Sequence, residues 1–439
     1  MRLAKFLFFL FFFSGPFLAW AQPSLSQEDR LLLEKIERDT FNYFVRYSDR
    51  DTGLARDSSR PGSPASITAT GFSLASLAIA QSHGWVPREE ARQKIRRTLQ
   101  LLKQQAEHQN GFFYHFLDSR TGHRVWRSEA SSIDTALLLA GVLLAAQYFE
   151  GTEIPKLAED LYRLVNWKWM MNGTHLVCHG WKPESGFLPS YWDTYNELMI
   201  LQALAIGAPA HAISPEAWEE WDRLESEYNG KRIVYSYSGS LFTYQFAQAF
   251  IDFRELSDRG INYFENSKKA TLANWEYSLS FKEKYQTYSE SSWGLSASLG
   301  PGGYRAYGAK PGLGIHDGTV APYASISSLV FTPELSLGAV KFFYRQYQKN
   351  IYGPSGFKDA FNLDKKWWSP EYLGVDQGIS ILMLENFLND GVVWKKFMQL
   401  PAIQKWVTLC KLREKDYSLR RNRSANREAV SSTISLVTQ

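Results

Sequence analysis

Four acidic residues in this sequence stand where a helix is expected to begin, each with aromatic residues close by in the chain. They are Glu129, Asp134, Glu197 and Asp376. A helix start stabilises an ionised carboxylate, so each residue taken alone is typical of a helix cap. Carboxyl groups that converge and differ in protonation state can instead work as a general acid and a general base. We interpret the four as candidate catalytic residues.

The residues around these carboxylates favour a sugar as the ligand. The faces of Trp and Tyr stack on the apolar faces of a sugar ring, while charged and amide groups hydrogen-bond to its hydroxyls. Hydrolysis of a glycosidic bond also needs two carboxyl groups flanking that bond. The candidate substrate-binding residues are Trp126, Arg127, Trp192, Tyr195, Trp293, Tyr304, Arg305, His316, Asp317, Trp367 and Trp368.

Two kinds of helical segment alternate along the chain and would position these residues. Charged, amphipathic segments are expected over residues 29–46, 87–107, 155–170, 215–228, 260–280 and 334–350. Nearly uncharged segments are expected over residues 67–80, 132–149, 195–207, 241–250, 318–330 and 376–388. A helix without a polar face must be covered on all sides, whereas an amphipathic helix has one face in water.

The alternation predicts an all-α fold, an (α/α)6 barrel with six inner, uncharged helices and six outer, amphipathic ones. A further helix near 397–410 would pack on the outside, and residues 232–238 are the best candidate for a short strand. The competing architecture is an α-solenoid, but the sequence has no fixed repeat of the kind such an array shows.

In such a barrel, every loop that leads into an inner helix opens at the same end. Four of these loops are long, over residues 109–131, 171–194, 285–317 and 351–375, and they hold five of the eight His. Long ordered loops at one end of a scaffold commonly carry binding and catalysis. We therefore expect the candidate residues to meet at one mouth.

Other chemistries find less support. The two cysteines of the 439-residue chain exclude a disulfide framework. His175, Cys178 and His179 are metal-ligand types at close spacing, but no second pair accompanies them, so we expect no metal. The Gly-rich stretch 300–308 lacks the Lys-Ser/Thr of a phosphate-binding loop, and no Gly-x-Ser-x-Gly nucleophile turn occurs. We expect no cofactor.

Both ends of the chain differ from its body. Residues 1–21 have the basic start, apolar stretch and Ala-x-Ala end of a secretory signal; an uncleaved anchor is the alternative. Residues 411–439 are basic and have little core-forming pattern, which predicts a disordered tail. Without these ends the net charge falls from +4 to −2. An acidic, exported body argues against nucleic-acid binding, and no stable membrane insertion is expected once the signal is removed.

The loop motifs resemble the bacterial glucoamylase-like domain, the group that contains the endo-β-1,2-glucanases of glycoside hydrolase family 144. The matching stretches follow one another in order across most of residues 30–410. They are Gly111–Asp118, Trp126–Gly141, Tyr195–Leu198, Trp293–Ser298, Gly302–Gly308, Asp317–Pro333, Gly356–Asp364 and Trp367–Gly378.

The resemblance implies an (α/α)6 toroid over residues 22–410, export to the periplasm, and inverting hydrolysis of β-1,2-glucan into short sophoro-oligosaccharides. Glu197 matches the general-acid position, and Asp134, Glu129 and Asp376 match acidic positions around the cleaved bond. As the base, Asp376 and Asp134 rank above Glu129, because a Glu before a helix can serve to position Arg127.

The sequence thus predicts a secreted, periplasmic glycoside hydrolase that cleaves β-1,2-glucan internally by acid/base catalysis, with a polysaccharide as its partner. Two alternatives stay open. A β-1,2-glucan transglycosylase on the same barrel would differ only in keeping water from the reacting bond. A glycan-binding protein without turnover would keep the aromatic residues but would not need the carboxylates.

Overall fold

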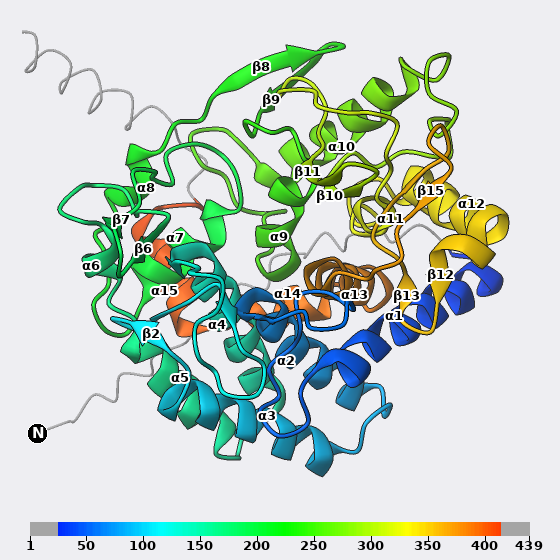
Figure 1. Cartoon of the computed structure of the whole chain (residues 1–439). Helices are drawn as coiled ribbons and strands as arrows, with labels where there is room; N and C mark the ends of the chain where they lie inside the picture. Colours follow the sequence, from blue (N-terminus) through cyan, green and yellow to red (C-terminus); the bar gives the residue numbers. More distant parts are fainter. Residues whose placement is uncertain (1–24, 414–439) are drawn as a thin grey trace, which may run out of the picture.

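The computed structural model describes residues 25–413, so the expected signal sequence and nearly all of the expected tail lie outside the described residues. Helices dominate this part of the chain (Figure 1). Their bounds are α1 Gln27–Tyr47, α2 Ile67–Ser82, α3 Arg88–Gln104, α4 Ser132–Tyr148, α5 Ile154–Leu164, α6 Trp167–Met170, α7 Leu198–Gly207, α8 Ala217–Glu220, α9 Phe242–Phe250, α10 Tyr263–Leu279, α11 Pro322–Ile326, α12 Pro333–Ile351, α13 Gly374–Leu388, α14 Val392–Phe397 and α15 Pro401–Leu409.

Five of the expected uncharged helices are covered on all sides, as predicted. Helices α2, α7 and α9 contain no charged residue, and all ten residues of α7 are buried. Helix α2 packs against α4, α4 against α7, α7 against α9, α9 against α13, and α13 against α2 again. The buried helices therefore close into a ring, because each offers apolar side chains to both of its neighbours.

Amphipathic helices surround this ring. Figure 1 shows α1, α3, α5, α10 and α12 along the periphery of the molecule. In α3 the buried residues Ala91, Ile95, Leu99 and Leu102 form one stripe, and the charged residues face water. The spacing of three and four residues between buried positions is that of a helix with one face on a core.

One expected outer helix is absent. Residues 215–228 form only α8, of four residues, followed by strand β8 (Glu225–Tyr228), which pairs with β9 (Lys231–Val234). The turn between the strands is Asn229-Gly230, both with positive φ, which is the usual signature of a tight hairpin. Helix α15 instead packs against α7, where a Cβ on Gly207 would lie 2.2 Å from the carbonyl oxygen of Ala402.

Two further expectations need correction. The segment 155–170 breaks into α5 and α6, because Asn166 caps α6 by accepting a hydrogen bond from the amide of Trp169 at 3.1 Å. The inner segment 318–330 contains only the five-residue helix α11, which starts at Pro322 and continues as turns. The expected helix near 397–410 is confirmed as α15, and α14 precedes it.

Short antiparallel ribbons build the loops that precede the buried helices. Their strands are β1 Ala65–Ser66, β2 His108–Gln109, β3 Phe112–Phe113, β4 Phe116–Leu117, β5 Ala130–Ser131, β6 Gly180–Lys182, β7 Gly186–Phe187, β10 Ala297–Gly300, β11 Gly303–Ala306, β12 Tyr352–Gly353, β13 Gly356–Phe357, β14 Phe361–Asn362 and β15 Trp367–Trp368. Because β1 pairs with β4 and β5 pairs with β6, loops far apart in sequence are held together at one end of the ring. Among residues 25–413, no helix has the length and apolar character needed to cross a bilayer.

Candidate active site

The first group of site residues lies where the loop 108–131 meets the start of α4. Asp134 is in the first turn of α4, and its two carboxylate oxygens accept hydrogen bonds from Thr68 at 2.6 Å and Ser131 at 2.5 Å. His115 Nδ1 lies 3.2 Å from Glu129 Oε1 and 3.6 Å from Asp134 Oδ2. Both oxygens of Asp134 are thus already engaged, which leaves it less free to accept a proton from water.

His115 and Glu129 form an ion pair. Burial opposes the charged form of His115, but the carboxylates of Asp134, Glu129 and Asp57 outweigh it and raise the pKa of His115 to about 9. The hydrogen bond from His115 lowers the pKa of Glu129 to about 2. A carboxylate with so low a pKa is a poor base, and this favours a positioning role for Glu129, next to His115, over the activation of water.

Glu197 has the properties of a general acid. It is the N-cap residue of α7, and the adjacent Asn196 side chain accepts a hydrogen bond from the Leu198 amide at 2.7 Å. Burial, together with the negative charge of Asp134, raises the pKa of Glu197 to about 7. A carboxyl group with this pKa is substantially protonated near neutral pH and can donate its proton to a leaving oxygen.

Asp376 is the buried partner of a second carboxylate, Asp359. Asp376 lies in the first turn of α13 and is 2% exposed, and Asp359 is fully buried in the loop before β14. Burial and the charge of Asp359 raise the pKa of Asp376 well above its ordinary value. Burial also raises the pKa of Asp359 to about 7, although the Leu299 amide donates to it at 2.7 Å.

The two aspartates behave as one unit. Asp376 Oδ2 and Asp359 Oδ1 are buried and have no hydrogen-bond partner among the described groups. Two neighbouring carboxylates cannot both be ionised without a large electrostatic cost, so such a pair shares one proton. The pair then keeps one ionised carboxylate whose basicity is raised, which is the property of a general base.

Tyr304 brings these groups into one site. It lies on the ribbon of β10 and β11, opposite Leu299, and its side chain is 60% exposed. Yet the surrounding protein, followed by the charges of Asp376, Asp359, Asp57 and Glu197, raises the pKa of its hydroxyl. The charges of these four carboxylates all act on the Tyr304 hydroxyl, which places Tyr304 in the neighbourhood of the acidic groups.

The remaining predicted binding residues divide by exposure. Trp126, Arg127 and Arg305 are exposed at the rim, and Trp367 and Trp368 are half-buried on β15. The ring of Trp126 lies 5.1 Å from that of Phe116, which holds it above the loop.

Trp192, Tyr195 and Trp293 do not line the mouth as predicted. Trp192 is buried, stacks on His179 and donates a hydrogen bond to Ser132 at 2.8 Å. Tyr195 and Trp293 are fully buried, Tyr195 against Tyr244 and Tyr263. These three rings pack against other side chains in the core. They therefore offer little surface to a sugar.

His316 and Asp317 also serve local structure. His316 packs among Tyr277, Phe281, Tyr285 and Tyr288. Asp317 accepts hydrogen bonds from the Tyr307 hydroxyl at 2.9 Å and the Thr319 hydroxyl at 2.6 Å. These contacts shape the loop beneath the Tyr304 ribbon.

The expected link between Glu129 and Arg127 is wrong. Arg127 Nε lies 3.8 Å from Glu184 on an exposed surface, whereas Glu129 pairs with His115. Sequence reasoning also gave no role to His115, Asp359 and Asp57, although all three contribute to the electrostatics of the site. His115 and Asp359 lie in stretches that resemble the family, Gly111–Asp118 and Gly356–Asp364, but their roles come from burial beside other carboxylates, which the sequence does not display.

Metal-ligand types come together at two places in the described chain, and the His175–His179 stretch is not one of them. One group is His115, Glu129 and Asp134, and the other is Glu37, His83 and Glu385. In the first group the charged His115 already compensates a carboxylate. We therefore interpret this group as a cluster of ion pairs at the candidate active site.

Comparison with known proteins agrees with this arrangement. Residues 189–401 match the sequence profile of the Glycoamylase family, described as "Putative glucoamylase". An endo-β-1,2-glucanase from Chitinophaga pinensis, solved with sophorotriose and glucose, superposes with a TM-score of 0.82 at 28% identity, covering 88% of this chain and 98% of that one. The chain is therefore similar, over most of its length, to a known β-1,2-glucanase and, over residues 189–401, to the glucoamylase-like family.

Other proteins similar to this chain are equally distant in sequence. A protein of Bacteroides uniformis, described in the same words as the family, has a TM-score of 0.83 at 29% identity and covers 89% of this chain and 98% of its own. An exo-β-1,2-glucooligosaccharide sophorohydrolase (non-reducing end) of Parabacteroides distasonis is 29% identical over 420 residues, or 86% of this chain. The chain spans 57% of the length of that enzyme.

Proposed function

We propose that the protein is a glycoside hydrolase that cleaves β-1,2-glucan internally. The observation that carries the proposal is that two kinds of carboxyl group, Glu197 and the Asp376–Asp359 pair, both act on the Tyr304 hydroxyl. Burial and the charge of Asp134 raise the pKa of Glu197 to about 7. The Asp376–Asp359 pair shares one proton. Hydrolysis of a glycosidic bond needs such a protonated acid and such an ionised base.

In the proposed reaction Glu197 protonates the oxygen of the leaving sugar. The ionised member of the Asp376–Asp359 pair takes a proton from the attacking water. Because Asp376 is only 2% exposed, this proton passes through an intervening water or hydroxyl group. Burial is the main cause of the raised pKa of Glu197, and the charge of Asp134, hydrogen-bonded on both oxygens, adds to it. A base without a covalent intermediate inverts the anomeric centre.

Comparison with relatives supports the β-1,2 linkage, because the endo-acting enzyme and the exo-acting enzyme are both named for it. The internal mode of cleavage is part of our proposal. We also propose that the scaffold is an (α/α)6 barrel in which α15 takes the outer place beside α7. From the pattern of residues 1–21 we propose that the protein works outside the cytoplasm, in the periplasm.

Purified protein incubated with linear β-1,2-glucan, an α-1,4-glucan and a β-1,3-glucan tests this proposal. We expect new reducing ends from β-1,2-glucan alone, with a mixture of oligosaccharides at early times. Release of sophorose only, from one chain end, would replace the internal mode by an exo mode. Cyclic or elongated products would indicate transglycosylation, and binding without any product would indicate a glycan-binding protein.

A further inference from the structure

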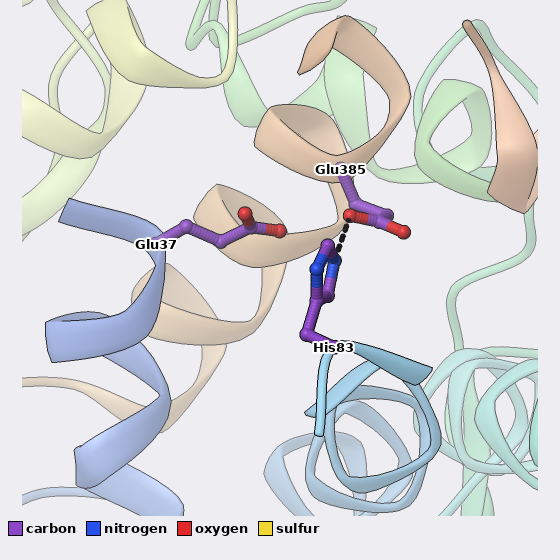
Figure 2. A group of neighbouring side chains, drawn as sticks. All are labelled: Glu37, His83 and Glu385. Carbon is purple, nitrogen blue, oxygen red and sulfur yellow. Dashed lines mark hydrogen bonds and ion pairs between the residues drawn. The ribbon is translucent and has the colours of Figure 1, made fainter. Parts of the chain in front are cut away.

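Three side chains of metal-ligand type meet at a place remote from the candidate active site. Glu37 comes from α1, His83 follows α2 as its C-cap residue, and Glu385 comes from α13 (Figure 2). One ligand atom of each lies within 4.8 Å of the other two. Glu385 follows Asp376 by nine residues on α13, or about 13 Å along the helix axis, towards the opposite end of the ring.

Glu37 is the unusual member of this cluster. It is fully buried, and neither of its carboxylate oxygens has a hydrogen-bond partner among the described groups. Figure 2 shows its carboxylate directed toward His83 and Glu385. Burial, with the charge of Glu385 next, raises the pKa of Glu37 well above its ordinary value. A buried carboxylate in this position needs a positive charge or a proton close to its oxygens.

Glu385 is oriented as a ligand would be. It is 3% exposed, its Oε2 accepts a hydrogen bond from Asn389 at 2.6 Å, and the same oxygen lies 2.8 Å from His83 Nε2. The imidazole of His83 stacks on Trp85, with ring centroids 4.8 Å apart. Outer contacts of this kind fix the direction of carboxylate and imidazole ligands around a metal.

Arg30, Lys35 and Arg38 border the same cavity, and the charge of Arg30 lowers the pKa of Glu37 by less than burial and the charge of Glu385 raise it. Arg30 pairs with Glu34 at 2.8 Å and donates to the carbonyl oxygen of Leu388. Lys35 pairs with Asp39. Two buried carboxylates therefore share a single imidazole, and the cluster lacks one positive charge when both are ionised.

We propose that Glu37, His83 and Glu385 bind a divalent transition-metal ion of the zinc class. An imidazole nitrogen with two carboxylate oxygens suits Zn²⁺ and its neighbours, whereas Ca²⁺ and Mg²⁺ prefer all-oxygen sites. Ligand atoms about 2 Å from the ion lie about 3 Å apart, close to the present 2.8 Å between His83 and Glu385. The cluster borders a cavity of about 580 Å³, also lined by Trp85 and Asn389, from which water can complete the coordination.

Such an ion would join the first long helix of the described chain to two helices of the buried ring. This proposed site differs from the expectation of no metal in the sequence analysis. That expectation considered ligand residues close together in the sequence, whereas these three come from distant segments. The ion would lie about nine residues along α13 from Asp376 of the candidate active site. Its role would be to stabilise the fold, since binding to the folded state alone raises stability by mass action.

The full chain, stripped with a chelator and dialysed against Zn²⁺, tests the site directly. Elemental analysis is expected to give one Zn²⁺ per chain, and thermal unfolding is expected to shift upward by at least about 2 °C. Mg²⁺ and Ca²⁺ serve as comparison ions and should give neither result. Glu37→Gln and His83→Gln should abolish Zn²⁺ binding and the shift in thermal unfolding. Glu34→Gln, which lies on α1 with Glu37 and borders the same cavity, should change neither measurement.

Absence of stoichiometric binding to the wild-type chain would overturn the proposal, whatever the variants do. Binding retained in a folded Glu37→Gln, His83→Gln double variant would overturn it as well. If Glu37→Gln is more stable than the wild type and Zn²⁺ has no effect, a proton shared by Glu37 and Glu385 compensates the charge, and the metal site is wrong. Circular dichroism confirms that each variant is folded before its metal content is compared.

Discussion

At the scale of single residues, the site works through differences in protonation among carboxyl groups of similar intrinsic acidity. Glu129 is held ionised by His115, Glu197 is held protonated near neutral pH, and Asp376 and Asp359 share a proton. The differences come from burial and from neighbouring charges. This division assigns the acid to the start of α7 and the base to the start of α13.

The pH dependence of kcat/KM follows from Glu197. Because burial and Asp134 raise its pKa to about 7, the acid form is lost as pH rises through that value, and we expect activity to decline above about pH 7. Asp134→Asn removes the negative charge that helps to keep Glu197 protonated, so the alkaline decline should move to lower pH. If the decline of kcat/KM at high pH is unchanged in a folded Asp134→Asn enzyme, that decline does not report the ionisation of Glu197.

The shared proton of the aspartate pair makes a second prediction. Asp359→Asn removes one carboxyl group of the pair, so the pKa of Asp376 should fall and its strength as a base should decrease. We expect a loss of kcat of about 10²-fold with a smaller change in KM, and a shift of the acidic limb to lower pH. A matched Asp364→Asn variant on the neighbouring turn, which accepts the Gln286 amide, should leave the acidic limb in place. If the pH profiles of wild type and Asp359→Asn have the same acidic limb, Asp359 and Asp376 do not share a proton.

At the scale of the elements, the buried ring depends on close approaches of helix backbones. A Cβ on Gly141 of α4 would lie 1.9 Å from the carbonyl oxygen of Gly71 of α2. Contact at this distance leaves no room for a methyl group, because both partners are backbone. The start of α2 and the start of α4, which carry Thr68 and Asp134, are held together by this approach.

Gly141→Ala is therefore expected to destabilise the protein by about 2 kcal/mol or more, measured as the free energy of unfolding in denaturant. Gly338→Ala in α12 is the matched control, since no atom lies within 4 Å of the Cβ position there. That exchange should be neutral or stabilise by up to about 1 kcal/mol through helix propensity. Equal stabilities for the two variants would show that the helices can separate without cost.

The ion pair of His115 and Glu129 joins two parts of the loop 108–131, and its contribution to stability depends on pH. His115 has a pKa of about 9 in the folded state, above its ordinary value of 6.5, so its stabilisation is complete below pH 6.5 and is lost as pH rises through 9. Glu129, with a lowered pKa, contributes above pH 4.5 and loses its effect as pH falls through about 2.

His115→Gln should consequently lower stability by about 1–3 kcal/mol between pH 5 and 6. The difference between wild type and variant should shrink toward zero above pH 9. Thermal unfolding across this range measures it, and a difference that stays constant with pH would show that packing alone connects His115 to the loop.

At the scale of the whole molecule, the order of buried and amphipathic helices could be predicted from sequence because an uncharged helix must be covered. The start of each buried helix then located Asp134, Glu197 and Asp376 at one end. The hairpin at Asn229-Gly230 could also have been predicted, since that dipeptide favours a tight turn. The amphipathic pattern of residues 215–228 led instead to the prediction of a helix before this turn.

Other parts of the site depend on tertiary packing that sequence does not display. Trp192 and Tyr195 stand beside carboxylates in the chain, but their rings turn into the core. Asp359 follows a Lys in an ordinary loop motif, and only its burial against Asp376 makes it part of the site. The cluster of Glu37, His83 and Glu385 joins three helices far apart in sequence.

The central claim is that Glu197 is the general acid of a β-1,2-glucan hydrolase, and Glu197→Gln tests it most directly. Turnover of linear β-1,2-glucan should fall by about 10³-fold or more, because the amide cannot donate the proton that the leaving oxygen needs. Glucan binding, measured by calorimetry, should stay within a few fold of the wild type. Glu159→Gln on α5, which removes only a surface ion pair with Arg163, should retain full turnover. Near-normal turnover by Glu197→Gln would contradict the account.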